Sequence, residues 1–492
     1  MLSSLLLFPA LALASPSYLG SRELASRAMG DSVEMVASTW FAGWHASTQD
    51  NPVFGLNDLS WEKYTSVVYS FAITTDDDAH VALEDSDATL LTQFVSLAHK
   101  NSVEARLAVG GWGGSQSYSY AVGSAANRTA FANSLLALQS KYNLDGFDFD
   151  WEYPGLQGIG CNVVNPDDTA NFLTFLKQLR ATPKGANLTL SAAVSVKPFA
   201  DGTGSPSTDV SGFASVLDFI EIMNYDVFGS WTDTVGPNAP LNDTCAPAHD
   251  QIGSAVSAVN AWTAAGIPAH QIVLGVASYG HSFTVSNQNA LTSSGALALY
   301  PPFDKSNPPP GDSWNNQGGP DQCGVQQPAG GEYEFWGLVQ NGFLQANGSV
   351  APGMDHIFDE CSQTDFVYNP KSQIMVAYDS AQAFAAKGDF IVNTGLRGFS
   401  MWEAGGDSKD ILLDSIRSAT GFDGDDESEP PCSTETSKTP VAEPGSLATG
   451  SSTPSPLALA SSAAPSLYHS LSLSYTGFSC IVILLLSSLC IL

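Results

Sequence analysis

Apolar segments of strand length alternate with amphipathic segments between about residues 34 and 422. The segments 87–101 and 127–142 are typical of the amphipathic ones and have the composition of helices. Alternating strands and helices predict a parallel sheet with crossover connections. Eight strand–helix units over a few hundred residues predict an α/β fold, a (β/α)8 TIM barrel. The expected strands are residues 34–44, 66–73, 104–112, 146–153, 188–196, 219–225, 272–280 and 395–403.

One connection is too long for a simple crossover. About 110 residues separate the seventh expected strand from the eighth. Residues 301–324 have the Pro, Gly and Asn content of a loop, whereas residues 330–344 have the composition of an ordered segment. A structureless loop of this length is rare inside a compact domain. We therefore expect residues 284–375 to form a small inserted α+β domain.

The fourth expected strand, within DGFDFDWEYPG at residues 145–155, carries acidic and aromatic residues in alternation. A period of two puts alternate side chains on opposite faces. Three carboxyl groups then share one face and three rings the other, namely Asp148, Asp150 and Glu152 opposite Phe147, Phe149 and Trp151. Crowded anions raise the pKa of at least one carboxyl group. A carboxylic acid protonated near neutral pH is what general acid catalysis requires.

Two other interpretations of this acidic segment fit the sequence less well. An acidic strand facing solvent is contradicted by the aromatic opposite face, and a Ca²⁺ or Mg²⁺ site lacks the Gly and Asn pattern of a calcium loop. Barrel enzymes place catalytic residues at the carboxyl ends of their strands. Glu152, Tyr225, Tyr279 and Trp402 all fall at such ends. The pattern therefore favours a catalytic or sugar-binding cluster of carboxylates.

The amino-terminal end has the features of a secretory signal. Residues 1–14 are mostly apolar and end in Ala-Leu-Ala, which predicts cleavage before Ser15. No Lys or Arg precedes the apolar stretch, so an N-terminal core helix is the alternative. Residues 15–33 are expected to be irregular.

The carboxyl-terminal end predicts a lipid anchor. Residues 423–467 read as a linker rich in Ser, Thr and Pro, and residues 468–492 end in an apolar tail. Small residues, a polar spacer and a terminal apolar tail match a GPI-attachment signal, with Ser461, Ser462 or Ala463 as the attachment residue. A tail-anchored helix and plain secretion are the alternatives. We expect a secreted, extracellular protein held at the plasma membrane or cell wall.

Charge and sequons agree with an extracellular location. The formal net charge of −31 argues against nucleic acid as a partner, because phosphate binding needs Lys and Arg. Contact with membrane is expected only through the lipid anchor, and we expect a monomer. Four Asn-x-Ser/Thr sequons predict a glycosylated surface, at Asn127, Asn187, Asn242 and Asn347.

Five cysteines precede the apolar tail, and their spacing fits no zinc pattern. One or two disulfides are expected in an oxidising compartment. Spacing alone cannot fix the pairing; we expect Cys323–Cys361 and Cys161–Cys245, with Cys432 left over in the linker.

Several sequence motifs resemble those of a known family. Residues 145–152 match the D-G-x-D-x-D-x-E signature of glycoside hydrolase family 18, the chitinases. Further segments, in the right order, resemble other motifs of that family: AVGGWGG at 108–114, MNYD at 223–226, SYGH at 278–281 and GFSMWE at 398–403. The long insertion is similar to the family's chitin insertion domain. The resemblance covers about residues 34–422.

The resemblance implies hydrolysis of chitin and chito-oligosaccharides by a substrate-assisted retaining mechanism, without a metal or other cofactor. Glu152 would protonate the glycosidic oxygen and later activate water. The 2-acetamido carbonyl of the sugar would attack the anomeric carbon. Asp150 would orient the acetamido group, Tyr225 would donate a hydrogen bond to its carbonyl, and Asp148 would share a proton with Asp150.

Substrate contacts are also implied by the resemblance. Trp402 would form the floor of the site. Trp112 would contact the substrate, and it follows Gly110 and Gly111, which leave room for a close approach. A packed core role is the alternative for either tryptophan. The remaining implied contacts are Tyr153, Asp226, Met223 and Tyr279.

Three positions depart from the family pattern. Ala108 replaces the usual Ser and removes a hydroxyl below the acids. His281 replaces Arg, which predicts a weaker or pH-dependent contact. Trp40 replaces Tyr, which is expected to remove a hydroxyl beneath Asp148.

Four functions therefore remain open at the level of sequence. The favoured one is an endo-acting chitinase tethered to the cell surface. The alternatives are a chitin-binding lectin without activity, a different enzyme at the same site (a wall-remodelling transglycosylase or an enzyme that cleaves the chitobiose core of N-glycans), and a purely structural partner protein. The intact Glu152 argues against the lectin, and the insertion argues against N-glycan cleavage.

Overall fold

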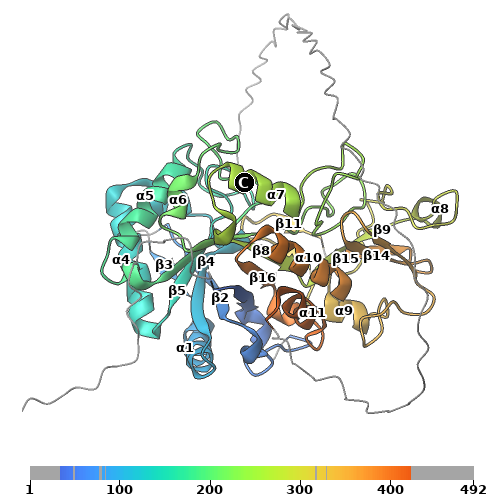
Figure 1. The fold of residues 1–492 in the computed structure, drawn as a ribbon, viewed down its shortest axis with the longest axis horizontal. Helices are drawn as coiled ribbons and strands as arrows, with labels where there is room; N and C mark the ends of the chain where they lie inside the picture. Colours follow the sequence, from blue (N-terminus) through green and yellow to red (C-terminus); the bar gives the residue numbers. More distant parts are fainter. Residues whose placement is uncertain are drawn as a thin grey trace, which may run out of the picture. The chain divides into compact units, whose positions relative to one another are not determined.

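The computed structural model describes residues 34–422, apart from 48–49, 77–79, 84, 316–317 and 329 (Figure 1). The expected signal peptide, N-terminal segment, linker and attachment signal, and with them Cys432, lie outside the described residues. Across the described ranges, no helix has both the length and the apolar character needed to cross a bilayer.

Eight parallel strands close into a barrel, which confirms the predicted fold class. Each strand pairs in parallel with the next, and the last strand pairs with the first through Thr39 and Met401. The barrel strands are β1 (Val36–Ala42), β2 (Ser66–Thr74), β4 (Glu104–Gly110), β5 (Gly146–Asp150), β6 (Thr189–Val194), β7 (Phe219–Ile222), β8 (Ile272–Ala277) and β16 (Gly398–Trp402). Each of them lies within or overlaps the residues predicted for it. A short strand, β3 (Val81–Ala82), pairs antiparallel with β2.

Helices cover the outside of the barrel (Figure 1). The longer ones are α1 (Asp85–Lys100), α4 (Ala125–Tyr142), α5 (Asp168–Arg180), α7 (Ala255–Ala264), α10 (Ala381–Thr394) and α11 (Ile411–Thr420). The short ones are α2 (Gly111–Gly114), α3 (Tyr118–Gly123), α6 (Ser211–Ala214) and the 3-10 turns η1 (Gly43–Ala46), η2 (Trp61–Lys63), η3 (Gly185–Asn187), η4 (Ala269–Gln271) and η5 (Ala404–Gly406).

Local sequence explains where several helices begin and end. The hydroxyl groups of Ser124, Ser254 and Ser380 accept hydrogen bonds from backbone N–H groups in the first turns of α4, α7 and α10. At their carboxyl ends, α4 and α10 stop at Asn143 and Gly395, which both adopt the left-handed conformation. These caps mark where the helices begin and end.

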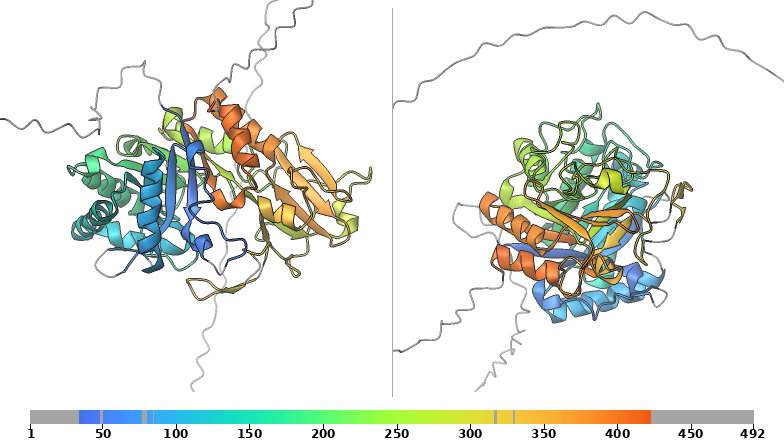
Figure 2. Two further views of the ribbon diagram at one scale, coloured as in Figure 1. Left: turned by 90° about the horizontal axis from the view of Figure 1, so that it is seen from below. Right: turned by 90° about the vertical axis from the view of Figure 1, so that its right-hand side faces the viewer.

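Between β8 and β16 the chain forms a second, antiparallel sheet. Its strand order is β12-β9-β15-β14-β13. The strands are β9 (Tyr279–Thr284), β12 (Glu332–Glu334), β13 (Asp355–Asp359), β14 (Thr364–Asn369) and β15 (Ile374–Tyr378), accompanied by α8 (Asn287–Ala290), α9 (Phe335–Gln340) and the hairpin of β10 (Gly319–Pro320) and β11 (Gln326–Gln327). Figure 2 shows this sheet, yellow to orange, beside the barrel. A small apolar core of its own includes Phe283, Phe366 and Met375.

The predicted disulfide pairing is wrong. The bonds are Cys161–Cys323 and Cys245–Cys361, with Cα–Cα distances of 5.7 and 6.2 Å. Each one joins a loop of the barrel to the insertion. Because the insertion folds back over loops at the carboxyl ends of the strands, cysteines far apart in the sequence become neighbours, which their spacing along the chain does not indicate.

Candidate active site

The three acidic side chains of the β5 segment lie where the barrel interior opens. Asp148 is fully buried, and Asp150 and Glu152 are 5 % and 8 % exposed. The intervening rings point the other way, as predicted: Phe149 packs on Phe172 at 5.8 Å, and Trp151 stacks on Tyr118 at 4.9 Å. The apolar face therefore anchors the strand to the helices, while the acids converge at the end of the barrel.

Two donors hold Asp148 in place. The indole N–H of Trp40 donates to Oδ2 at 3.0 Å, and the hydroxyl of Ser191 donates to Oδ1 at 2.7 Å. Trp40 brings no hydroxyl, as expected, but its indole N–H supplies a donor to Asp148 instead. Ala108, as expected, brings no hydroxyl; its methyl group joins a small apolar cluster with Trp40 and Val68.

The pKa of each acid is raised. Burial is the largest cause for all three, and it raises the pKa of Glu152 to about 7, with the charge of Asp226 adding to the shift and a hydrogen bond from Tyr153 opposing it. Burial, then the negative charges of Glu152 and Glu221, raises the pKa of Asp150 well above its ordinary value. Burial and Glu221 do the same for Asp148. These pKa shifts have the direction that the sequence predicts, but loss of hydration on burial contributes more to them than repulsion between the carboxylates.

A buried ion pair lies beneath the acids and was not predicted from the sequence. Arg106 of β4 and Glu221 of β7 are both fully buried, with Nη2 and Oε1 3.3 Å apart. Both residues alternate with apolar neighbours in their strands, which is the signal for side chains that point into the barrel. Arg106 also donates to the hydroxyls of Ser38 and Ser191. The chain of contacts continues through Ser191 to Asp148.

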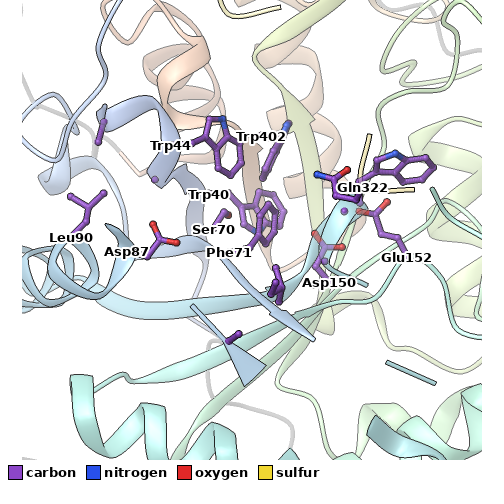
Figure 3. Close-up of a pocket in the computed structure, with 18 of the residues that line it drawn as sticks. Trp40, Trp44, Ser70, Phe71, Asp87, Leu90, Asp150, Glu152, Gln322 and Trp402 are labelled. Carbon is purple, nitrogen blue, oxygen red and sulfur yellow. The ribbon is translucent and has the colours of Figure 1, made fainter. Parts of the chain in front are cut away.

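A groove with a volume of about 1070 Å³ opens above Asp150 and Glu152 (Figure 3). It is lined by eight of the predicted site residues: Gly110, Trp112, Asp150, Glu152, Met223, Tyr225, Asp226 and Trp402. A smaller hollow of about 280 Å³ shares Glu152 with the groove and is lined by Tyr153. Asp148 lies below the groove. Gly111 and Tyr279 stand behind its lining, at the start of α2 and beside the ring of Tyr225.

Close backbone packing brings the end of β4 against β5. Gly110 has φ +107°, and a Cβ there would lie 2.2 Å from the carbonyl oxygen of Asp150. Only glycine satisfies both conditions. The turn places Trp112 at the groove, where it is 52 % exposed. That exposure excludes the core alternative for Trp112.

Aromatic rings form the floor and one wall of the groove. Trp402 packs against Trp40, Phe71 and Trp44 with ring centroids 5.9, 5.7 and 6.3 Å apart, and it keeps a partly exposed face in the groove. Trp44 is itself 48 % exposed. Sequence reasoning missed Trp44 and Phe71 as lining residues, although both lie at the ends of predicted strands. Exposed rings of this kind suit stacking on apolar ligand faces.

Asp226 is contacted by His281, the residue that replaces the family's usual Arg. The hydroxyl of Tyr279 donates to Asp226 Oδ1 at 2.6 Å, and His281 Nε2 lies 2.8 Å from the same oxygen. Burial lowers the pKa of His281, but the hydrogen bond and charge of Asp226 offset this, and the pKa is raised. In the protonated state the imidazolium keeps an ion pair at this position.

Another buried carboxyl group, that of Glu403, lies behind the floor of the groove. Glu403 follows Trp402, accepts a hydrogen bond from the Ala42 N–H at 3.2 Å and does not line the groove. Burial raises its pKa to about 8 against an ordinary value of 4.5; the Ala42 bond opposes the shift and Asp50 adds to it. Among the described residues, no cluster of three or more His, Cys, Asp or Glu is arranged to hold a metal ion.

Glu403 predicts a stability that depends on pH. Its folded-state pKa lies above the unfolded one, so its contribution is complete below about pH 4.5 and is lost as pH rises through about 8. The free energy of unfolding should fall by at most about 1.4 kcal/mol per pH unit from this group. Urea unfolding between pH 5 and 8 would measure it, and Glu403→Gln should make the decline shallower. An unchanged slope in the variant would contradict the assignment.

Known proteins are similar to this chain in sequence and in fold. The model of glycosyl hydrolases family 18 matches residues 38–407. A chitinase-like effector of Moniliophthora roreri is 50% identical over 389 residues, which cover 79% of this chain and 93% of that protein. A crystal structure of a chitinase from Rhizomucor miehei aligns with a TM-score of 0.69 and 32% identity, over 78% of this chain and 99% of that one. The Ostrinia furnacalis Group IV chitinase in complex with allosamidin aligns with a TM-score of 0.65 and 25% identity, over 79% and 99%.

Proposed function

Because the chain belongs to glycosyl hydrolases family 18, we propose that it hydrolyses the β-1,4 bonds of chitin and chito-oligosaccharides by a retaining, substrate-assisted mechanism. The observation that carries the proposal is Glu152, which lies in the wall of the groove beside Asp150 with its pKa raised to about 7. A carboxyl group with this pKa is largely protonated in mildly acidic solution and can also act as a base, as a catalytic acid–base requires.

In the first step Glu152 transfers its proton to the glycosidic oxygen as the bond from that oxygen to the anomeric carbon breaks. The acetamido carbonyl oxygen of the same sugar forms the new bond to the anomeric carbon. In the second step Glu152, now ionised, removes a proton from water. The water oxygen bonds to the anomeric carbon from the side opposite the acetamido oxygen, which leaves. The configuration is retained and Glu152 recovers its proton.

Asp150 is suited to orient the acetamido group. Its Oδ1 is buried and has no hydrogen-bond partner among the described residues, so an acetamido N–H would satisfy it. Tyr225 lines the same groove, and its hydroxyl can donate to the acetamido carbonyl. Asp148 lies one step further in, held by Trp40 and Ser191. Burial and the charge of Glu221 raise its pKa, and the negative charge of Asp150 adds to the shift.

A second candidate function is capture of chito-oligosaccharides without cleavage. The observation in its favour is that a relative sharing 50% identity is named a chitinase-like effector. The two functions separate in one experiment: wild-type protein with a chito-oligosaccharide series from pH 3 to 8, followed by chromatography of products and by calorimetric binding. Product release supports hydrolysis, and the sizes of the products distinguish endo from exo cutting. Tight binding without products at any pH supports capture.

The cellular context extends this proposal. The apolar first residues, the acidic composition and the small-residue, spacer and apolar-tail pattern at the carboxyl end support a secreted enzyme tethered by a GPI anchor at the plasma membrane or wall. Release of the protein from intact cells by a phosphatidylinositol-specific phospholipase would test the anchor.

The raised pKa of Glu152 predicts how activity depends on pH. Because the protonated form starts the reaction, kcat/KM should fall as pH rises through about 7. Asp226 contributes to that pKa through its charge, so Asp226→Asn should move the alkaline limb to lower pH, besides lowering kcat/KM through its lost groove contact. Initial rates between pH 4 and 9 would measure the limb. An Asp226→Asn limb that stays in place or moves upward would contradict this account.

A further inference from the structure

The β10–β11 hairpin of the insertion forms part of the groove wall. Gln322, in its turn, is exposed and lines the groove together with Trp112, Gly113 and Glu152. A Cβ on residue 113 would lie 2.7 Å from the amide carbon and nitrogen of Gln322, so glycine there lets the amide lie against the α2 backbone. Figure 3 shows Gln322 and Glu152 at the same end of the groove.

The hairpin is ordered by its own hydrogen bonds. Asp321 Oδ1 accepts the backbone N–H groups of Cys323 and Val325 at 2.9 and 2.8 Å, and Oδ2 accepts the side-chain amide of Gln327 at 2.7 Å. Gln322 lies between these anchored residues. The residues on both sides of Gln322 are therefore anchored, and its side chain lies at the groove.

A disulfide fixes the hairpin to the loop that carries the acid. Cys323 of the hairpin bonds to Cys161. Asn162, which follows Cys161, donates its side-chain N–H to the backbone carbonyl oxygen of Glu152 at 2.7 Å. The backbone N–H of Val163 donates to the Gln116 carbonyl at 2.9 Å, which ties the same loop to the α2–α3 connection. One loop thus holds both the backbone of Glu152 and the hairpin that carries Gln322.

From this arrangement, and resting on the proposed function, we propose that Gln322 determines specificity by hydrogen bonding the acetamido group of a sugar unit that stacks on Trp112, and that the Cys161–Cys323 bond positions it. A primary amide offers both a donor and an acceptor, which complement the carbonyl and N–H of an acetamido group. An exposed indole beside an oriented amide provides the apolar face and the polar contact that a sugar site combines.

The test measures binding by calorimetry in a Glu152→Gln background, so that the ligand is not cleaved. Gln322→Ala should weaken binding of the N-acetylglucosamine hexamer by about three- to tenfold, the size expected for one lost hydrogen bond. Gln326→Ala is the matched control, because Gln326 lies on the same hairpin but outside the groove lining. It should change the affinity for the hexamer less than twofold. Equal affinities for the two variants would overturn the proposal.

The positioning role of the disulfide is tested by a second pair of variants. Cys161→Ser/Cys323→Ser should weaken hexamer binding at least as much as Gln322→Ala, and adding Gln322→Ala to it should cause no further loss. Cys245→Ser/Cys361→Ser removes the other link between barrel and insertion and should leave affinity unchanged. If Gln322→Ala weakens hexamer binding by the same factor with and without the Cys161–Cys323 bond, the positioning role is overturned.

These outcomes are distinguishable from failure of the proposed function. If wild-type protein releases no products but Gln322→Ala still loses affinity for the hexamer, hydrolysis is refuted and the role of Gln322 stands. If the Glu152→Gln parent does not bind the hexamer at all, the role of Gln322 is overturned, whereas product release by the wild-type protein decides the proposed hydrolysis separately.

Discussion

Glu152→Gln should lower kcat for chito-oligosaccharide hydrolysis by about 10³-fold, because a general acid contributes on the order of 10² to 10⁴ to the rate. The glutamine amide fills the same space beside Asp150 but has no proton acidic enough to give to a leaving oxygen. The change also removes one of the charges that raise the pKa of Asp150. Binding of intact oligosaccharides should change little, because the other groove residues are untouched. Single-turnover rates and calorimetric dissociation constants would separate the two effects.

Glu403→Gln is the matched control for this loss. Glu403 is also a buried carboxyl group with a raised pKa at the end of a barrel strand, but it does not line the groove. The control should keep kcat within about threefold of wild type, since it touches no reacting atom. A Glu152→Gln protein that retains more than about a tenth of wild-type kcat would refute the assigned acid.

The periodic features of the chain made the barrel predictable. Each barrel strand is a short apolar run between helical segments, and this alternation carries the topology. In β5 the period of two also predicted which side chains face the barrel interior, since Asp148 and Asp150 point inward while Phe149 packs on α5. Local pattern was sufficient here because burial on one face of a strand fixes the orientation of every residue in it.

Contacts between distant elements were not predictable in the same way. The disulfide partners depend on how the insertion folds back over the barrel loops, and spacing along the chain holds no record of that path. Trp40 was expected only to remove a hydroxyl beneath Asp148, and the hydrogen bond from its indole N–H to Asp148, made from β1 to β5 through the barrel interior, was not predicted. Such contacts are set by the closure of the barrel, which joins strands far apart in the sequence.

Arg106 is the strongest case of such a contact, and Arg106→Met should lower the free energy of unfolding by about 3–5 kcal/mol. The guanidinium is fully buried and faces Glu221, with both carboxylate oxygens of Glu221 within 3.4 Å of its nitrogens. Methionine matches much of the volume but leaves Glu221 buried without its counter-charge. Arg106 also lowers the pKa of Asp148, so the variant should hold Asp148 protonated to higher pH. Urea unfolding at pH 6 would measure the loss.

A double variant separates lost charge pairing from lost packing. In Arg106→Met/Glu221→Gln the interior holds no unpaired Glu221 charge, so about half of the lost stability should return, because an uncompensated buried charge is the main cost of breaking such a pair. If packing around the guanidinium were the cause instead, the second substitution would add its own loss and the double variant would be the less stable of the two. Arg106→Lys keeps the charge but lacks the forked donors that reach Ser38, Ser191 and Glu221 together. Its free energy of unfolding should therefore lie between those of wild type and Arg106→Met. An Arg106→Met protein as stable as wild type would show that the ion pair beneath the acids does not support the barrel.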